Sequence, residues 1–216
     1  MPVGRSAEVP AGRFPGWVDR FRAGHGGRVR LSIEDDPTLR AVDGATAALD
    51  VAFDPGTGWA DLTSLLTHVA RVAASHPFAL LLVRRGGWAV ARCEGERVVA
   101  SKVGTRYVQG RTKKGGSSQQ RYARRRGNQA DSVVSAAVEA ASDVWGVGMH
   151  RGPLTVITGG DRLLLADAVG QLTKRAPLAV SARRLEVPDP LRAVLHRAAE
   201  AACAVRVHIL DPAAGA

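Results

Sequence analysis

Hydrophobic residues recur at helical spacing in three stretches of the chain. In the two longer stretches the apolar positions lie three and four residues apart over several turns, which predicts amphipathic helices. The first long stretch ends before Pro77 and carries Leu62, Leu65, Leu66, Val69, Val72 and Ala73. The second runs from about residue 121 to 145 and carries Ala130, Val133, Val134, Ala137, Val138, Ala141, Val144 and Trp145. The shorter stretch contains Phe14, Trp17, Val18 and Phe21.

Strand patterns occupy much of the remaining chain. Residues 29–33 alternate, residues 45–53 form a more ambiguous extended stretch, and the run FALLLV at 78–83 predicts a buried strand. The alternation from 88 to 111 predicts two or three antiparallel strands, and residues 154–210 alternate strand, helix, strand, helix and strand. This order predicts an α/β fold whose mixed sheet has flanking helices. We expect a single domain of residues 13–211 between a flexible N-terminus, 1–12, and a flexible C-terminus, 212–216.

The composition indicates a chain that buries a core without disulfides. Of its 216 residues, 45% are hydrophobic, which is enough for one large domain. Cys93 and Cys203 are far apart and lack a CxxC or histidine partner, and the six histidines lack HxxxH spacing, so we expect no metal and no other cofactor. The first residues do not form a signal peptide and the longest apolar run is too short to cross a bilayer. We therefore expect a cytoplasmic protein without membrane contact.

The excess positive charge lies in one segment. The chain has 30 Lys and Arg against 20 Asp and Glu, which gives a net charge of +10. Residues 97–130 contain no acidic residue but ten basic ones, and the rest of the chain is formally neutral. These ten residues, the cationic segment below, are Arg97, Lys102, Arg106, Arg111, Lys113, Lys114, Arg121, Arg124, Arg125 and Arg126. Such a local concentration of cations favours a phosphate-rich partner, and a solvated helix end is the alternative.

The centre of the cationic segment reads KKGGSSQQRYARRR, residues 113–126. Its glycines allow a tight turn from strand to helix, and Ser117 or Ser118 can cap the helix that follows. Exposed arginines in the first turns oppose the helix dipole at a cost of about 0.3 to 1 kcal/mol each. A backbone phosphate that approached this helix end would meet amide N–H groups and guanidinium groups together. The stretch therefore favours contact with a phosphate backbone over a merely solvated helix end.

At these residues the sequence resembles a known family. The run GTRYVQGRTKKGGSSQQRYARRRGNQA, residues 104–130, is similar to the catalytic loop of the actinobacterial Vms-like release factors (VLRF), distant relatives of the central domain of eukaryotic peptide release factors. The Gly-x-x-Gln marker of that loop is matched by Gly116, Ser117, Ser118 and Gln119. The resemblance implies a ribonuclease H-like domain that hydrolyses peptidyl-tRNA on stalled large ribosomal subunits. Its implied partners are that subunit, peptidyl-tRNA and ribosomal RNA, with the protein monomeric when free.

The resemblance also implies roles for individual residues. Gln119 and Gly116 are the expected catalytic residues, because a neutral amide can position water and a glycine permits close approach. Support of the loop is expected from Gly115, Ser117, Ser118 and Gln120. RNA phosphates are expected to contact Arg111, Lys113, Lys114, Arg121, Arg124, Arg125 and Arg126.

Two other functions remain open at this point. The eukaryotic relatives are described as cutting tRNA near its 3′ end, and in that case an arginine such as Arg111 or Arg121 would assist attack by a ribose hydroxyl without metal. The other alternative is a ribosome- or RNA-binding module that performs no chemistry. The sequence also leaves open whether Gln119 or Gln120 is the positioned glutamine.

Overall fold

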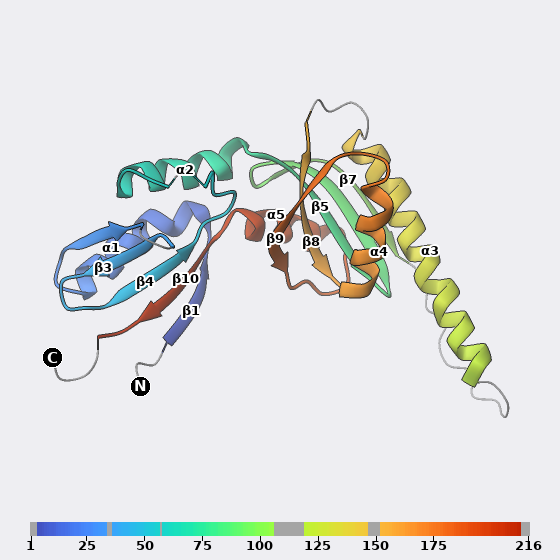
Figure 1. Cartoon of the computed structure of the whole chain (residues 1–216), viewed down its shortest axis with the longest axis horizontal. Coiled ribbons are helices and arrows are strands. Elements are labelled where there is room, and N and C mark those ends of the chain that lie inside the picture. The colour runs from blue at the N-terminus through green and yellow to red at the C-terminus, as the bar shows by residue number, and fades with distance from the viewer. Residues whose placement is uncertain (1–3, 34–35, 57, 106–118, 147–151, 213–216) are drawn as a thin grey trace. The chain divides into compact units, whose positions relative to one another are not determined.

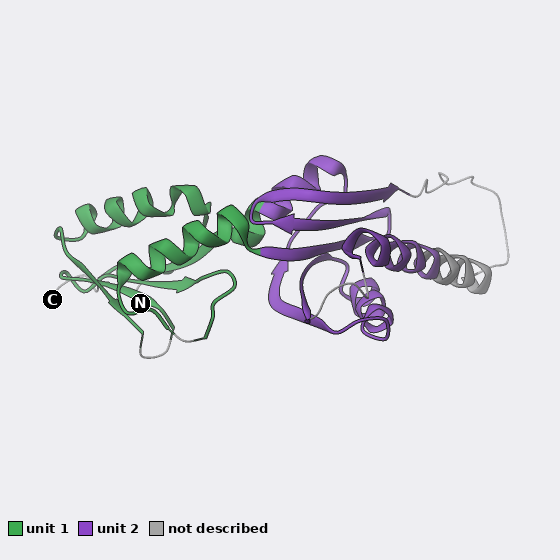
Figure 2. Ribbon diagram, turned by 90° about the horizontal axis from the view of Figure 1, so that it is seen from above, with its two compact units in different colours: residues 1–76, 200–216 green, residues 77–199 purple. Residues whose placement is uncertain are grey.

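The chain forms two compact units, each with its own five-stranded sheet (Figure 2). The computed structural model describes residues 4–33, 36–56, 58–105, 119–146 and 152–212, and it describes the side chains of the helix that starts at Gln119 from Ala130 onward. Unit 1 comprises residues 1–76 and 200–216, and unit 2 comprises residues 77–199. The range expected as one domain, 13–211, is thus divided between the two units.

The sheet of unit 1 is antiparallel. Its strand order is β1 (Gly4–Val9), β10 (Val205–Leu210), β4 (Thr46–Asp50), β3 (Thr38–Ala41) and β2 (Val29–Ser32). Residues 4–9, which belong to the stretch 1–12, pair along their whole length with β10, and Val9 is buried. The paired backbone groups and this apolar residue attach β1 to the sheet.

Two helices pack on one face of the unit 1 sheet (Figure 1). A short 3₁₀ turn (Ala11–Arg13) leads into α1 (Phe14–Gly24), and α2 covers Leu62–Ser75. Asp61 caps α2 by accepting a hydrogen bond from the Ser64 N–H at 2.7 Å, and Ser64 returns one to the Asp61 N–H. Both helices were predicted. Their apolar stripes join the sheet in a core that includes Phe14, Val18, Phe21, Leu39, Leu49, Leu65, Val69, Val205 and Val207.

Unit 2 contains the predicted mixed sheet. Its strand order is β7 (Arg97–Thr105), β6 (Gly87–Glu94), β5 (Pro77–Arg84), β8 (Leu154–Gly160) and β9 (Leu178–Leu185). The pairs β5–β8 and β8–β9 are parallel, whereas β6 is antiparallel to both β5 and β7. The helices are α3 (Gln119–Trp145), α4 (Arg162–Leu172) and α5 (Arg192–Cys203), the last of which passes from unit 2 into unit 1. The α/β class is therefore confirmed.

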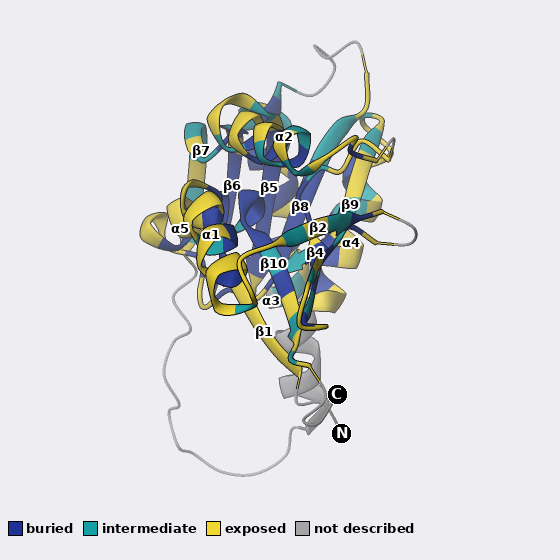
Figure 3. Ribbon diagram, turned by 90° about the vertical axis from the view of Figure 1, so that its left-hand side faces the viewer, coloured by how far each residue is buried: buried dark blue, intermediate teal, exposed yellow. Residues whose placement is uncertain are grey.

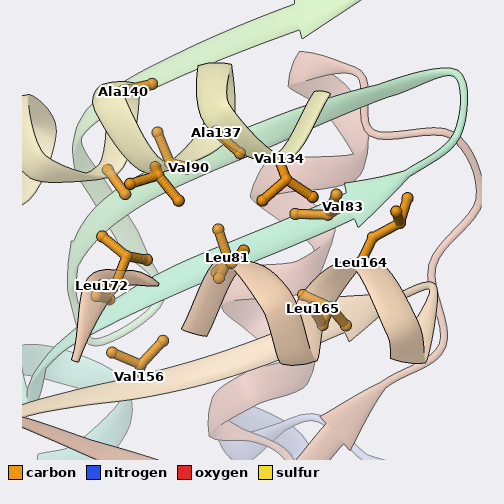
Figure 4. Packing of buried hydrophobic residues seen from close by; sticks show 14 of the residues in the cluster. Leu81, Val83, Val90, Val134, Ala137, Ala140, Val156, Leu164, Leu165 and Leu172 are labelled. Carbon is orange, nitrogen blue, oxygen red and sulfur yellow. The ribbon is translucent and has the colours of Figure 1, made fainter. Parts of the chain in front are cut away.

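The core of unit 2 lies between its sheet and the helices α3 and α4 (Figure 4). Six consecutive residues of β5, 78–83, are buried, so both faces of this central strand are covered (Figure 3). Leu81 and Val83 lie on the face toward α3 and α4, where they meet Val134, Ala137 and Leu165. The apolar stripe predicted for residues 121–145 is this packed face of α3.

Both cysteines are buried free thiols. Burial in apolar surroundings raises the pKa of Cys93 to about 12, because it disfavours the thiolate. The described residues contain no group of three or more His, Cys, Asp or Glu placed to hold a metal ion. None of the helices in the described residues combines the length and the apolar character that crossing a bilayer requires.

Candidate functional site

The predicted catalytic loop connects β7 to α3. Gly116, the other loop residues before it and both serines fall within 106–118, which lies outside the described residues. Gln119 and Gln120 are the first two residues of α3, so the predicted glutamine stands at a helix start. Outside the described side chains, but in the first turns of the same helix, lie Arg121, Arg124, Arg125 and Arg126. What the structure describes is the support on either side of the loop.

Two glycines shape the strand end from which the loop leaves. Thr105 at the end of β7 pairs with Gly87, and Gly104 pairs with Trp88. A Cβ added at Gly87 would lie 2.5 Å from the carbonyl oxygen of Gly104, and one added at Gly104 would lie 2.4 Å from Cε2 of Trp88. A larger residue at Gly87 would meet the backbone of β7, and one at Gly104 would displace the Trp88 ring, so glycine keeps this end of the ladder closed.

The second support is the packed part of α3. Trp145, which is fully buried at the end of the helix, donates a hydrogen bond from Nε1 to the carbonyl oxygen of Ala91 in β6 at 2.9 Å. Val134 and Val138 are also fully buried against the sheet. Because this bond joins the helix to the strand that pairs with β7, it connects the two supports of the loop.

Ion pairs at the surface add to this support. Lys102 of β7 pairs with Asp143 of α3. Arg175, which follows α4, binds Glu139 at 2.6 Å and the hydroxyl of Ser142 at 3.1 Å. The hydrogen bond and charge of Arg175 hold the pKa of Glu139 below its usual range. Exposed pairs of this kind contribute little to stability, but they orient α3 relative to its neighbours.

Two members of the cationic segment are neutralised. Arg97 pairs with Glu94, which lies just before the segment, and Lys102 pairs with Asp143, which lies beyond it. The hairpin and the helix bring these carboxylates to the two residues, although the segment itself contains no acid. The eight remaining cations lie between 106 and 126, outside the described side chains.

The strand directions place several chain segments at one edge of the unit 2 sheet. Because β5 and β7 are both antiparallel to β6, and β8 and β9 are parallel to β5, four strands end at this edge. We call it the carboxyl edge. The last residue pairs at this edge are Thr105 with Gly87, Gly87 with Arg84, Val83 with Gly160 and Gly159 with Leu185. The loop from β7 to α3 therefore leaves from the carboxyl edge.

Unit 2 carries the positive charge of the chain. It contains 21 Lys and Arg against 9 Asp and Glu, whereas unit 1 contains 9 against 11. Ten of these cations belong to the cationic segment. The excess positive charge thus belongs to the same unit as the loop. This distribution of charge fits contact with a polyanion.

The structure also gathers three arginines that the sequence analysis did not single out. Arg84, Arg162 and Arg184 line a cleft at the carboxyl edge beside Gly160. β8 ends at Gly160, and Asp161 caps α4 directly after it by accepting hydrogen bonds from the N–H groups of Leu163 and Leu164. The sequence offered one clue to this cluster: each of the three arginines lies at or near the end of a strand or the start of a helix.

Comparison with known protein families gives a match that covers unit 2. A family model described as the Actinobacteria/Chloroflexi VLRF1 release factor matches residues 76–208, which is more than half of the chain. The match includes all of unit 2 and therefore the loop, α3 and the carboxyl edge. Among curated proteins, none matches the chain.

Proposed function

Because the chain belongs to the VLRF1 release factors of Actinobacteria and Chloroflexi, we propose that it is a peptidyl-tRNA hydrolase that frees nascent peptides on stalled large ribosomal subunits. Family membership gives the release-factor role in ribosome rescue. The observation that best supports the finer proposal is the loop with the Gly116-Ser117-Ser118-Gln119 sequence at the centre of the cationic segment, directly before α3. Its cations suit the ribosomal and transfer RNA that surround a peptidyl-tRNA ester.

In this proposal Gln119 acts by position. A glutamine amide is neither a base nor a nucleophile near neutral pH, but its carbonyl oxygen can accept a hydrogen bond from the attacking water. The water oxygen bonds to the ester carbonyl carbon, the bond to the ribose oxygen breaks, and a proton from the water passes to that oxygen. Because α3 begins at Gln119, the first backbone N–H groups of the helix have no intrahelical partners and can stabilise the developing oxyanion.

The remaining loop residues have supporting roles in the proposal. Gly116 lets the backbone approach the ester closely, and Gly115, Ser117 and Ser118 set the turn before the helix. RNA phosphates are held by Arg111, Lys113, Lys114, Arg121, Arg124, Arg125 and Arg126. The protein acts in the cytoplasm as a monomer that meets its substrate on the large subunit.

The test uses stalled ribosome complexes that carry a labelled nascent peptide on tRNA. We expect Gln119→Ala to lower the rate of peptide release by about 100- to 1,000-fold, the loss that follows removal of one transition-state hydrogen-bonding group, while ribosome binding stays unchanged. Gln120→Ala identifies which glutamine is positioned. Gln171→Ala is the matched control, because Gln171 lies on α4 and bonds only to Asp167 at 3.1 Å in the described structure.

The products distinguish the proposal from its alternatives. Peptidyl-tRNA hydrolysis leaves tRNA with an intact 3′ end, whereas cleavage of the tRNA leaves a shortened one. A shortened tRNA product would therefore show that the protein cleaves tRNA and does not hydrolyse the ester. If Gln119→Ala and Gln120→Ala both released peptide at the parent rate, the protein would act through binding alone.

A further inference from the structure

The carboxyl edge contains a cleft at the point where the chain connections of unit 2 diverge. From β5 the chain continues to β6 and β7 on one side of the sheet, and from β8 it continues through α4 to β9 on the other side. In open sheets with parallel strands, ligands bind outside the carboxyl ends of the strands at such a point. The cleft here has a volume of about 380 Å³ and lies next to Arg84 of β5 and Gly160 of β8. We call it the switch-point cleft.

Guanidinium groups from three elements line this cleft. Arg84 comes from the end of β5, Arg162 from the start of α4 and Arg184 from the end of β9. Arg84 donates from Nη1 to the carbonyl oxygen of Val187 at 2.5 Å, and Arg184 donates from Nη2 to the carbonyl oxygen of Gly160 at 3.3 Å. These bonds hold Arg84 and Arg184 to the backbone beside the cleft. A guanidinium has five N–H donors, so each can keep such a bond and still bind a phosphate oxygen.

Two acidic residues, Asp161 and the exposed Glu186, line the cleft beside its three arginines, so its formal charge stays positive. Asp161 accepts hydrogen bonds from the first turn of α4 and lies 3.7 Å from Arg85. Asp189 lies 3.9 Å from Nε of Arg84, and its side chain is 76% exposed. Ion pairs near the surface at such distances are weak, so a phosphate can displace them. Arg162 is exposed and forms no ion pair with the described part of the chain.

The backbone of β8 beside the cleft packs closely against the backbone of β5. Gly160 has a φ of +111°, and a Cβ added there would lie 2.2 Å from the carbonyl oxygen of Val83. The N–H of Asp161 donates to that same oxygen at 2.8 Å. Only glycine satisfies these contacts, and as a result the carbonyl oxygen of Gly160 is held where Arg184 binds it.

We propose that the switch-point cleft is a second RNA site, which binds a backbone phosphate of an RNA strand through Arg84, Arg162 and Arg184. The inference rests on the proposed function for the identity of the RNA, because the loop and the cleft then face one substrate. Adjacent strands lie about 4.8 Å apart, so the three steps from β7 to β8 place the cleft about 14 Å from the strand end where the loop begins. Arg85 lies in the turn from β5 to β6, between these two points.

The closing experiment measures the binding of a short fluorescent single-stranded RNA to the full chain over a range of salt concentrations. We expect Arg162→Gln to weaken binding by about tenfold and to lower the salt slope by about 0.7, the value for one lost phosphate contact on a single strand. Arg84→Gln and Arg184→Gln should also weaken RNA binding and lower the salt slope. Thermal melting checks that both variants are folded. Arg92→Gln is the matched control, because exposed Arg92 pairs with Ala79 near the opposite end of β5.

Each result supports or overturns the proposal. Binding by Arg162→Gln that equals that of the parent or of Arg92→Gln would overturn it. Inorganic phosphate at the concentration of the RNA phosphates should not displace the RNA, and displacement would overturn the assignment to a polymer. Peptide release assays separate the two proposals: if the parent releases no peptide but its RNA binding depends on Arg162, the hydrolase proposal fails and the cleft stands. If peptide release depends on Gln119 but RNA binding does not change in Arg162→Gln, the cleft proposal fails and the hydrolase proposal stands.

Discussion

Replacement of Gly87 by alanine tests whether the glycines at the base of the loop matter. The added Cβ would lie 2.5 Å from the carbonyl oxygen of Gly104 and 3.3 Å from Cα of Thr105, so it meets backbone atoms that cannot rotate away. The strands β6 and β7 must therefore separate at their last pair before the loop. Overpacking of this kind costs about 1 to 3 kcal/mol. For a chain of this size that loss lowers the thermal midpoint by about 2 to 12 °C.

The measurement is thermal unfolding followed by circular dichroism, with Gly170→Ala as the control. Gly170 is exposed inside α4, and a Cβ added there would meet nothing within 4 Å. In a helix interior alanine is favoured over glycine by about 1 kcal/mol, so this substitution should raise the midpoint. We also expect Gly87→Ala to slow peptide release at temperatures where it remains folded, because the loop base shifts. A Gly87→Ala protein as stable as the parent would refute the reasoning.

Three further predictions concern stability and reactivity. Trp145→Phe removes the hydrogen bond to Ala91 and part of a fully buried ring, so the free energy of unfolding should fall by about 2 to 3 kcal/mol in denaturant titrations. Hydrogen bonds from Ser64 lower the pKa of Asp61, so its contribution to stability is present above its unfolded pKa and is lost as the pH falls through the folded value. Thermal midpoints should therefore decline below about pH 4, and less so in Asp61→Asn. Burial that raises the pKa of Cys93 to about 12 should prevent its alkylation at pH 8 unless denaturant is added, as mass spectrometry can show.

The periodic parts of the fold were predictable from the chain. Apolar residues at helical spacing predicted α2 and α3, because one buried face of a helix must repeat every three to four residues. FALLLV predicted β5, because a strand covered on both faces has an unbroken apolar run. Pro77 marked the end of α2 correctly, since β5 begins there.

The assignment of strands to sheets was not predictable in the same way. β10 continues the alternation of strand and helix after α5, yet it pairs with β1 and β4 in the other sheet. Alternation reports that a strand has two different faces and says nothing of its partner. Residues 38–41 are too short for a periodic signal, and the exposed side chains of β1 give none, so β3 and β1 were missed.

The candidate site also has one part that local sequence patterns predict and one part that they do not. Charge and the spacing of Gly116 and Gln119 single out the loop, because both are local features of the chain. The switch-point cleft depends on Arg84 and Arg184, which lie one hundred positions apart and meet only because β5, β8 and β9 are parallel neighbours. Their role follows from strand order, which local patterns do not contain.

The position of β10 sets the order in which the chain can be completed. β10 lies between β1 and β4, so β1 has no other strand to pair with until residues 205–210 have been synthesised. Unit 2, by contrast, has all five of its strands by Leu185. During translation, the unit that carries the loop can therefore acquire its structure while the first part of the chain still waits for its last strand. Loss of the final ten residues would remove most of that strand and leave β1 without its partner.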